Sequence, residues 1–283
     1  MARQRLGQHF LGDPGWREKI ARAIRVSPHG MQPAPQAAPK DFCWIEIGAG
    51  HGEMTEHLLR SGAPVIAVEL DPPLIVSLQR LAQKHSNLTV APGDVLQTDI
   101  AALAAGRRMR IYGNLPYYIT SPILHHLFQF ADLIDEVHIV IQLEVAARLT
   151  ARPGNKQYGY LSVVTQFYAR PDFALRLPRS AFRPPPEVGS ALVTLRFPGE
   201  NAQLQISDAP AFLEFVKTCF AQKRKTLSNN LRPLATPERI RQLLKELKLR
   251  EDARAEQLTV AQFAAVYRAI SSAQPATGPG NRS

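Results

Sequence analysis

Four consecutive residues, Asn114-Leu115-Pro116-Tyr117, have the types and spacing to hold an aromatic amine for chemistry at nitrogen. The exocyclic amine of adenine is a weak nucleophile because its lone pair is delocalised into the ring. The Asn114 side-chain oxygen and the Leu115 backbone carbonyl could accept hydrogen bonds from both N–H groups and favour the pyramidal amine. Pro116 would stiffen the turn, and the Tyr117 ring would offer a face for base stacking. The alternative is a proline-containing turn beside a core tyrosine.

A glycine-rich run, Glu46-Ile47-Gly48-Ala49-Gly50-His51-Gly52, follows an apolar stretch and could approach a nucleotide-like ligand closely. Glu69 lies 21 residues past Gly48, where an acidic side chain can accept both ribose hydroxyls. NAD, FAD and S-adenosylmethionine all carry that ribose. The dinucleotide fingerprint is Gly-x-Gly-x-x-Gly, which aims a helix N-terminus at a pyrophosphate. The Gly-x-Gly-x-Gly spacing found here favours S-adenosylmethionine, which has no phosphate.

Two further segments could complete the site. Asp94 could accept from an adenine amino group while the neighbouring backbone N–H of Val95 donates to the ring, or Asp94 could simply cap a helix. Phe182 precedes the proline-rich stretch Arg183–Val188. An extended proline segment could present the Phe182 ring to the second face of the base, or the ring could belong to the core.

Strands and helices must position these residues. Short apolar runs that alternate with amphipathic stretches predict where those elements lie. Strands are expected over 42–47, 64–69, 88–91, 109–112 and 136–141, and helices over 14–27, 54–59, 74–82, 100–105 and 122–130. This alternation predicts a doubly wound α/β sheet of parallel strands joined by crossovers.

The pattern changes further along the chain. Strands are expected over 159–168 and 190–197, with a turn at 182–188, and helices alone follow at 211–222, 237–245 and 260–270. We therefore predict a first domain over 1–200, with a basic N-terminal arm and a proline-rich loop at 27–40. A helical domain over 201–272 and a disordered tail over 273–283 would follow.

Charge is unevenly distributed along the chain. Its 283 residues carry 34 Lys and Arg against 24 Asp and Glu, a net charge of +10. Residues 41–142 carry −5, whereas 1–40, 143–200 and 201–283 carry +5, +4 and +6. Basic flanks around an acidic middle favour a large anionic partner, nucleic acid first and a membrane surface second. The alternative is ordinary solvated lysines and arginines.

Composition narrows the class of protein. No apolar run approaches the about 18 residues of a membrane span, and the N-terminus has no apolar core of a secretory signal. Cys43 and Cys219 are far apart in the sequence. We expect reduced thiols in a cytoplasmic protein, with no metal site.

Taken in order, the motifs resemble those of the ribosomal RNA adenine dimethyltransferases, and among them the bacterial enzymes that act on the small subunit. The resemblance runs from about Arg5 to about Tyr267. It includes Leu6–Leu11, the glycine run, Glu69, Gly93-Asp94, the Asn114 tetrad, Tyr158-Gly159, Phe182–Val188 with Ser190, and Gln222–Leu231.

The resemblance implies a mostly parallel, seven-stranded Rossmann-like sheet of the S-adenosylmethionine-dependent methyltransferases, with a small all-helical C-terminal domain. It implies S-adenosylmethionine as donor and N6-dimethylation of two adjacent adenosines in the 3′-terminal hairpin loop of 16S rRNA. The partner would be the assembling 30S subunit, and the enzyme would be a cytoplasmic monomer. By motif, the cofactor-binding residues would be His9, Leu11, Gly48, Gly50, Glu69, Asp94, Val95 and Asn114. His9 stands where Asn is commoner in the family.

The basic flanks then gain candidate contacts to RNA phosphates. Lys223, Arg224 and Lys225 are expected to close the helix that starts near residue 211, spread around its end. Arg5 and Arg148 are further candidates, and Arg3 and Arg152 weaker ones.

Two alternative functions share most of these features. A 23S rRNA adenine N6-methylase would have the same cofactor motifs and tetrad, but Thr226–Leu231 and Gly7–Leu11 favour the small-subunit enzyme. A ribosome assembly factor that acts only by binding would not need an intact glycine run, Glu69 and Asn114. DNA adenine methylation is disfavoured because nothing resembles a sequence-reading domain.

Overall fold

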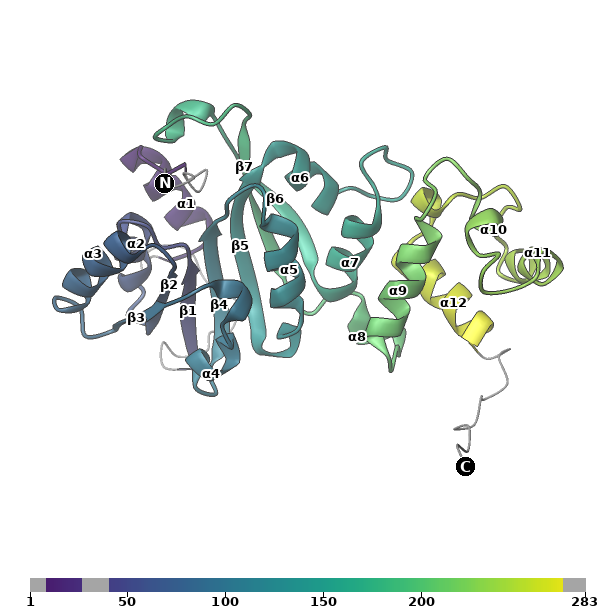
Figure 1. Cartoon of the computed structure of the whole chain (residues 1–283), viewed down its shortest axis with the longest axis horizontal. Coiled ribbons are helices and arrows are strands. Elements are labelled where there is room, and N and C mark those ends of the chain that lie inside the picture. Colours follow the sequence, from purple (N-terminus) through teal and green to yellow (C-terminus); the bar gives the residue numbers. More distant parts are fainter. Residues whose placement is uncertain (1–8, 27–40, 272–283) are drawn as a thin grey trace, which may run out of the picture. The chain divides into compact units, whose positions relative to one another are not determined.

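Seven strands of the computed structural model form one sheet in the order β3-β2-β1-β4-β5-β7-β6 (Figure 1). The structure describes residues 9–26 and 41–271, so the proline-rich loop 27–40, the tail 273–283, Arg3 and Arg5 lie outside the described residues. The strands are β1 (Phe42–Ile47), β2 (Val65–Glu69), β3 (Leu88–Pro92), β4 (Arg108–Asn114), β5 (Ile134–Gln142), β6 (Arg170–Leu177) and β7 (Ser190–Arg196). Neighbouring strands from β3 to β5 are parallel, and β7 runs antiparallel to β5 and β6.

Helices connect these strands as the predicted alternation requires. They are α1 (Pro14–Ala23), α2 (Glu53–Leu59), α3 (Pro72–Ala82), α4 (Ile100–Ala104), α5 (Thr120–Phe128) and α6 (Leu143–Leu149). Local chemistry sets where several of them begin: Asp13 caps α1 by accepting from the Trp16 backbone N–H at 3.1 Å, and Pro14 takes the first helical position. The predicted doubly wound α/β sheet is confirmed.

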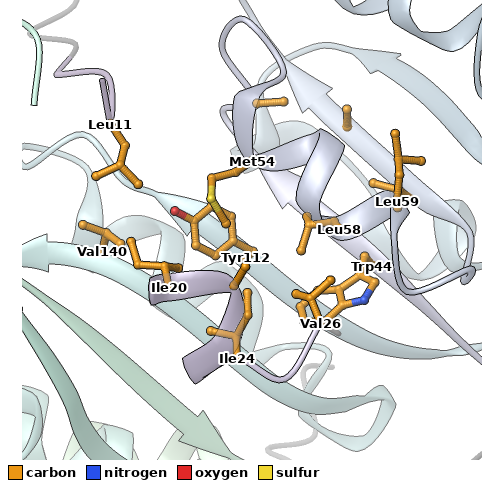
Figure 2. Close-up of a cluster of buried hydrophobic side chains, with 14 of the residues drawn as sticks. Leu11, Ile20, Ile24, Val26, Trp44, Met54, Leu58, Leu59, Tyr112 and Val140 are labelled. Atoms are coloured by element: carbon orange, nitrogen blue, oxygen red, sulfur yellow. The ribbon is translucent and has the colours of Figure 1, made fainter. Parts of the chain in front are cut away.

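An apolar core on one face of the sheet includes residues of the central strands β1 and β4. All six residues of β1 are buried. Trp44 from β1 and Tyr112 from β4 pack against Ile20 and Ile24 of α1 and Leu58 of α2 (Figure 2). Strands buried on both faces have continuous apolar runs, so their sequence pattern is easily recognised.

The predicted strand at 159–168 is wrong: these residues form helix α7 (Tyr160–Tyr168). The run is rich in aromatic and β-branched residues, which favour strands. Its helical start is nevertheless stabilised locally, because Ser162 accepts from the Gly159 N–H at 3.1 Å and donates to the Arg148 carbonyl. Val163 and Phe167, four positions apart, pack into one apolar cluster, so tertiary burial overrides the local preference.

The sixth strand lies just after that helix, at β6, where the sequence indicated none. Its residues Arg-Pro-Asp-Phe-Ala-Leu-Arg-Leu are mostly exposed or half-buried, and β6 pairs only with β7. An edge strand tolerates Pro171 and charged side chains because one of its sides needs no hydrogen-bond partner. An edge strand of this kind lacks the apolar pattern that identified the central strands.

Packing divides the chain into two units. One ends at Ala147 and includes Arg170–Pro198, and the other is Arg148–Ala169 with the chain from Gly199 onward. The second unit is all helical among its described residues: α7, α8 (Asn201–Leu204), α9 (Ala209–Cys219), α10 (Leu227–Asn230), α11 (Pro237–Glu246) and α12 (Val260–Ser271). Its core gathers Phe167, Phe212 and Phe263. The second unit therefore starts before the predicted boundary at 200, because α7 contributes to this core.

Three properties of the described residues bear on the class of protein. No helix among them is long and apolar enough to span a membrane. They contain no cluster of three or more His, Cys, Asp or Glu suited to a metal ion. Cys43 and Cys219 are both buried thiols outside any disulfide.

Candidate active site

A cavity that is open to solvent lies at the carboxyl ends of β1, β2, β3 and β4. The strand order places β1 between β2 and β4, so the direction of winding reverses between β1 and β4. Ligands of open α/β sheets bind at this switch point. The cavity is lined by His9, Phe10, Ile47, Gly48, Gly50, Val68, Glu69, Leu70, Gly93, Asp94, Val95, Asn114, Leu115, Pro116, Tyr117, Tyr118, Ile119 and Ile123.

The glycine run forms the floor between β1 and α2. Gly48 and Gly50 have φ of +68° and +62°, which disfavour any residue with a Cβ. A Cβ on Gly48 would meet nothing within 4 Å and would occupy free space of the cavity. A Cβ on Gly50 would lie 3.2 Å from the Phe10 ring. The glycines therefore keep open a space that side chains would fill.

Glu69 is 5% exposed, and its carboxylate is held by backbone N–H groups. Its Oε2 accepts from Gly50 at 2.8 Å, and Oε1 accepts from Leu70 and Asp71 at 2.8 and 3.0 Å. A carboxylate has about four acceptor positions, so three are used by the backbone. Those bonds fix the orientation of the side chain and leave capacity for a ribose hydroxyl.

Asp94 starts a 3-10 turn, Val95–Gln97, and its Oδ1 accepts from the Leu96 N–H at 2.9 Å. The cap expected as an alternative is therefore present. The same residue and Val95 also line the cavity, and the second carboxylate oxygen stays available as an acceptor. The two interpretations of Asp94 are compatible.

Asn114 ends β4, and its side chain is oriented by the N-terminal segment. Its Nδ2 donates to the backbone carbonyl of His9 at 2.7 Å. With the amide nitrogen committed to His9, the Oδ1 atom is the acceptor left for a ligand. The turn that follows is held by hydrogen bonds to the Pro116 carbonyl from the Ile119 N–H and the Thr120 hydroxyl.

Tyr117 is fixed within the cavity wall. Its hydroxyl lies 2.8 Å from Ser190 Oγ on β7, and burial raises the pKa of the phenol. Its ring centroid is 5.7 Å from that of His9, with the planes tilted by 30°. An anchored, half-buried ring beside Asn114 is suited to stacking on a planar base.

The segment around His9 joins three parts of the site. Phe10 forms a β-bridge with Arg183, with N–H···O distances of 3.0 and 2.8 Å. The His9 ring bonds through Nδ1 to the Pro184 carbonyl at 2.9 Å. Because a carbonyl can only accept, Nδ1 carries the proton. His9 thus links two segments: its ring donates to the proline-rich segment, and its backbone carbonyl accepts from Asn114.

Two of the residues expected at the site are in the core instead. Phe182 and Leu11 are 1% and 7% exposed, belong to the apolar cluster under the sheet, and do not line the cavity. In an extended segment successive side chains point to opposite sides, so the bridge at Phe10 and Arg183 turns both neighbours inward. The expectation that Phe182 presents its ring to the base is corrected by this burial.

The remaining predicted site residues do line the cavity. These are His9, Gly48, Gly50, Glu69, Asp94, Val95, Asn114, Leu115, Pro116 and Tyr117. Their roles as cofactor or catalytic residues stay predictions. Lining residues that the sequence analysis missed include Phe10, Leu70 and Tyr118. Each is a direct neighbour of a predicted residue, which is the signal that could have identified them.

A buried carboxyl group, that of Glu46, connects the strand before the glycine run to the helix after it. Glu46, on β1, is 2% exposed, and Thr55 of α2 donates to its Oε2 at 2.5 Å. Burial raises the pKa of Glu46 to about 8. The group is therefore mostly protonated near neutral pH and ties β1 to α2 on either side of the glycines.

Those of the expected basic contacts that fall among the described residues lie in the second unit. Helix α9 ends at Cys219, so Lys223, Arg224 and Lys225 are in the turn that follows and do not close the helix as predicted. All three are exposed, and Lys223 Nζ donates to the Lys156 carbonyl at 3.2 Å. Arg148 is exposed on α6. Their roles as RNA contacts stay predictions.

The cavity residues fit a cofactor with a ribose and an adenine. Gly48 leaves space that a Cβ would fill, Glu69 presents an oriented carboxylate, and Asp94 has an unused acceptor oxygen. S-Adenosylmethionine carries both groups, and nothing in the described lining resembles a diphosphate cradle beyond the single glycine run.

Comparison with known proteins adds independent information. A family model described as "Ribosomal RNA adenine dimethylase" matches residues 1–272. The chain is 40% identical over 262 residues to Ribosomal RNA small subunit methyltransferase A of Xanthomonas euvesicatoria pv. vesicatoria, covering 93% of this chain and 94% of that protein. It is 38% identical over 270 residues to the protein of that name from Xylella fastidiosa, covering 95% and 96%.

Solved structures have the same fold. A dimethyladenosine transferase from Plasmodium falciparum superposes with a TM-score of 0.77 at 23% identity, over 93% of this chain and 98% of that one. The 23S rRNA methyltransferase ErmE superposes with a TM-score of 0.68 at 25% identity, over 93% and 99%.

Proposed function

Because the chain belongs to the ribosomal RNA adenine dimethylase family, we propose that it dimethylates N6 of two adjacent adenosines in the 3′-terminal hairpin loop of 16S rRNA. S-Adenosylmethionine is the methyl donor of this family of enzymes. The observation that carries the proposal is Asn114, whose Nδ2 is committed to the His9 carbonyl at 2.7 Å. Its Oδ1 is thereby directed to act as an acceptor at the cavity.

The cofactor is proposed to occupy the end of the cavity formed by the glycine run, Glu69 and Asp94. When bound, it supplies a methyl group on a positively charged sulfur, which an amine can attack by in-line displacement. Glu69, held by three backbone N–H groups, would accept from the ribose. Asp94 and the Val95 N–H would contact the adenine of the cofactor. Gly48 would let that ligand approach the backbone.

The target adenine is proposed to enter at the Asn114 end. Asn114 Oδ1 and the Leu115 carbonyl would accept from its N6 hydrogens and favour the pyramidal amine. The Tyr117 ring, anchored through Ser190, would stack on the base that leaves the RNA helix. After transfer, the cationic amine loses its proton readily, so no strong base is needed.

The partner is ribosomal RNA, and we propose that the enzyme meets it within the assembling 30S subunit. The two named relatives are small-subunit methyltransferases, which supports the small subunit over the large one. Lys223, Arg224 and Lys225 would contact phosphates, with Arg5 and Arg148 as further contacts. We further propose that the first unit carries the methyltransferase chemistry, that the second, helical unit binds RNA and the ribosome, and that the enzyme is a cytoplasmic monomer.

A labelling experiment tests the proposal directly. The protein is incubated with methyl-labelled S-adenosylmethionine and, separately, with small subunits that lack the two dimethyladenosines, with large subunits, and with DNA. Nuclease digestion and chromatography then identify the labelled nucleoside. We expect dimethyladenosine from small subunits only. Label confined to large-subunit RNA would favour a 23S rRNA methylase, and no label on any substrate would favour an assembly factor that acts by binding.

A further inference from the structure

Tyr118 is an exposed aromatic residue at the rim of the cavity. Six large apolar side chains are exposed among the described residues, and Tyr118 has the largest exposed fraction, 63%. Only Tyr118 and Leu70 of these six line the cavity. In the part of the chain that the structure describes, no ring contact or hydrogen bond involves the Tyr118 side chain. A single exposed apolar side chain is ordinary on a protein surface. What distinguishes Tyr118 is that it also lines the cavity, where it can contact a ligand.

Its neighbour Tyr117 has a different environment. Tyr117 is anchored to Ser190 through its hydroxyl at 2.8 Å and lies beside the His9 ring. Tyr118 follows it in the turn between β4 and α5 (Thr120–Phe128), without such an anchor. Of the two adjacent tyrosines, the anchored one belongs to the cavity wall and the exposed one to its mouth.

Neither Leu70 nor Phe182 is placed to contact the acceptor RNA at the entrance to the cavity. Leu70, 53% exposed, directly follows Glu69 at the end of β2, where the cofactor ribose is expected and would cover it. Phe182 is 1% exposed within the core. Among the aromatic residues that line the cavity, Tyr118 is the most exposed, and it lies four positions after Asn114, where the acceptor is proposed to enter.

We propose that Tyr118 stacks on the nucleobase next to the target adenosine, outside the cavity. The inference rests on the proposed function and adds to it a residue that positions the acceptor. When a base is extruded from a loop, its neighbour loses a stacking partner. An aromatic ring at the mouth can replace that partner. Base–aromatic stacking alters affinity by about 5- to 150-fold per base on alanine substitution.

Three variants test the role. Tyr118→Ala removes the ring, Tyr118→Phe keeps the ring without the hydroxyl, and Phe173→Ala removes an exposed aromatic, 40% exposed on the edge strand β6 and away from the cavity. Each is assayed for kcat and KM with undermethylated small subunits, for subunit binding by filter retention, for S-adenosylmethionine binding by calorimetry, and for thermal unfolding.

We expect Tyr118→Ala to raise KM and weaken subunit binding by about 5- to 150-fold, with kcat, cofactor affinity and Tm close to those of the parent protein. Tyr118→Phe and Phe173→Ala should behave like the parent. Full rescue by phenylalanine would identify stacking, and not a hydrogen bond, as the interaction.

Several results would overturn the assignment. Unchanged KM and binding in Tyr118→Ala would show that no base rests on the ring. A loss of kcat alone would place the ring on the reacting base, and weaker cofactor binding would assign it to the cofactor. If the parent protein transfers no label to small subunits, the proposed function fails, and the binding assay still decides whether Tyr118 contacts the subunit.

Discussion

The cavity and the basic turn at 223–225 hold their polar groups in opposite ways. In the cavity, Glu69 accepts from three backbone N–H groups and Asn114 is bonded to His9. In the turn, Lys223, Arg224 and Lys225 are exposed on irregular backbone. The difference fits the two roles that we propose for these regions. Transfer to a weak nucleophile needs acceptors fixed in place before the reaction, whereas attraction to phosphates acts over about 8–10 Å and tolerates many arrangements.

The largest effect should come from breaking the fixed geometry at Asn114. Asn114→Ala removes the acceptor that we propose for the target amine, and we expect kcat to fall by about 100- to 1,000-fold, as for other preorganised groups of this kind. Cofactor binding, measured by calorimetry, should largely survive. As a matched comparison, Asn114→Asp keeps an acceptor oxygen but cannot donate to the His9 carbonyl, and should also be impaired. Normal turnover of Asn114→Ala would contradict the role assigned to this residue.

Replacing the oriented carboxylate is expected to have the next largest effect. In Glu69→Gln, one oxygen becomes an NH2 group that cannot accept from the backbone N–H groups of Gly50, Leu70 or Asp71. Leaving a buried donor unpaired costs about 1–3 kcal/mol. Urea unfolding should report that loss, and calorimetry should report weaker cofactor binding. If the variant were as stable as the parent protein, the three backbone hydrogen bonds would not be holding Glu69 in place. The contrast between the cavity and the basic turn would then fail.

The buried support of the glycine run predicts a pH dependence of stability. Burial raises the pKa of Glu46 from 4.5 to about 8 in the folded protein. The folded state therefore binds more protons than the unfolded state between these values, so this contribution to stability is full below about pH 4.5 and declines as the pH rises through 8. The slope is at most about 1.4 kcal/mol per pH unit.

Glu46→Gln isolates that contribution, because glutamine can still accept from Thr55 but does not titrate. Urea unfolding at several pH values between 5 and 8.5 (roughly the window set by the shift) should show a flatter dependence in the variant than in the parent. Equal slopes in the two proteins would contradict the buried, protonated state.

The smallest effect on turnover should come from the basic turn. Replacing Lys223, Arg224 and Lys225 together by alanine should leave kcat at saturating subunit unchanged and weaken binding. The dependence of log K on log salt concentration should flatten by about one unit for each phosphate that is no longer neutralised. Arg241→Ala, exposed on α11 in the same unit and already paired with Glu238, serves as the charge control. An unchanged salt slope in the triple variant would separate this turn from RNA binding.

The two regions also differed in how well they could be predicted. Strand β1 was predicted at its observed limits, and Gly48, Glu69 and Asn114 were placed at strand ends that the structure brings to one cavity. The helix before the basic turn was predicted too long, because α9 ends at Cys219. Buried parallel strands have a continuous apolar signal, whereas the end of an exposed helix depends on caps and packing that leave little trace in the sequence.

The sequence by itself determined the alternating α/β order, the glycine run, the acidic residue 21 positions later, and the tetrad that marks the family. These are local patterns that can be recognised within a few residues of the sequence. They point to one site because parallel strands have their carboxyl ends at the same edge of the sheet. Only the tertiary structure decided that α7 is a helix, that Phe182 is buried while Tyr118 is exposed, and that His9 orients Asn114. Each of these outcomes depends on contacts between residues that are distant in the chain. In α7, the burial of apolar side chains by such contacts outweighs the preference of the local sequence for a strand.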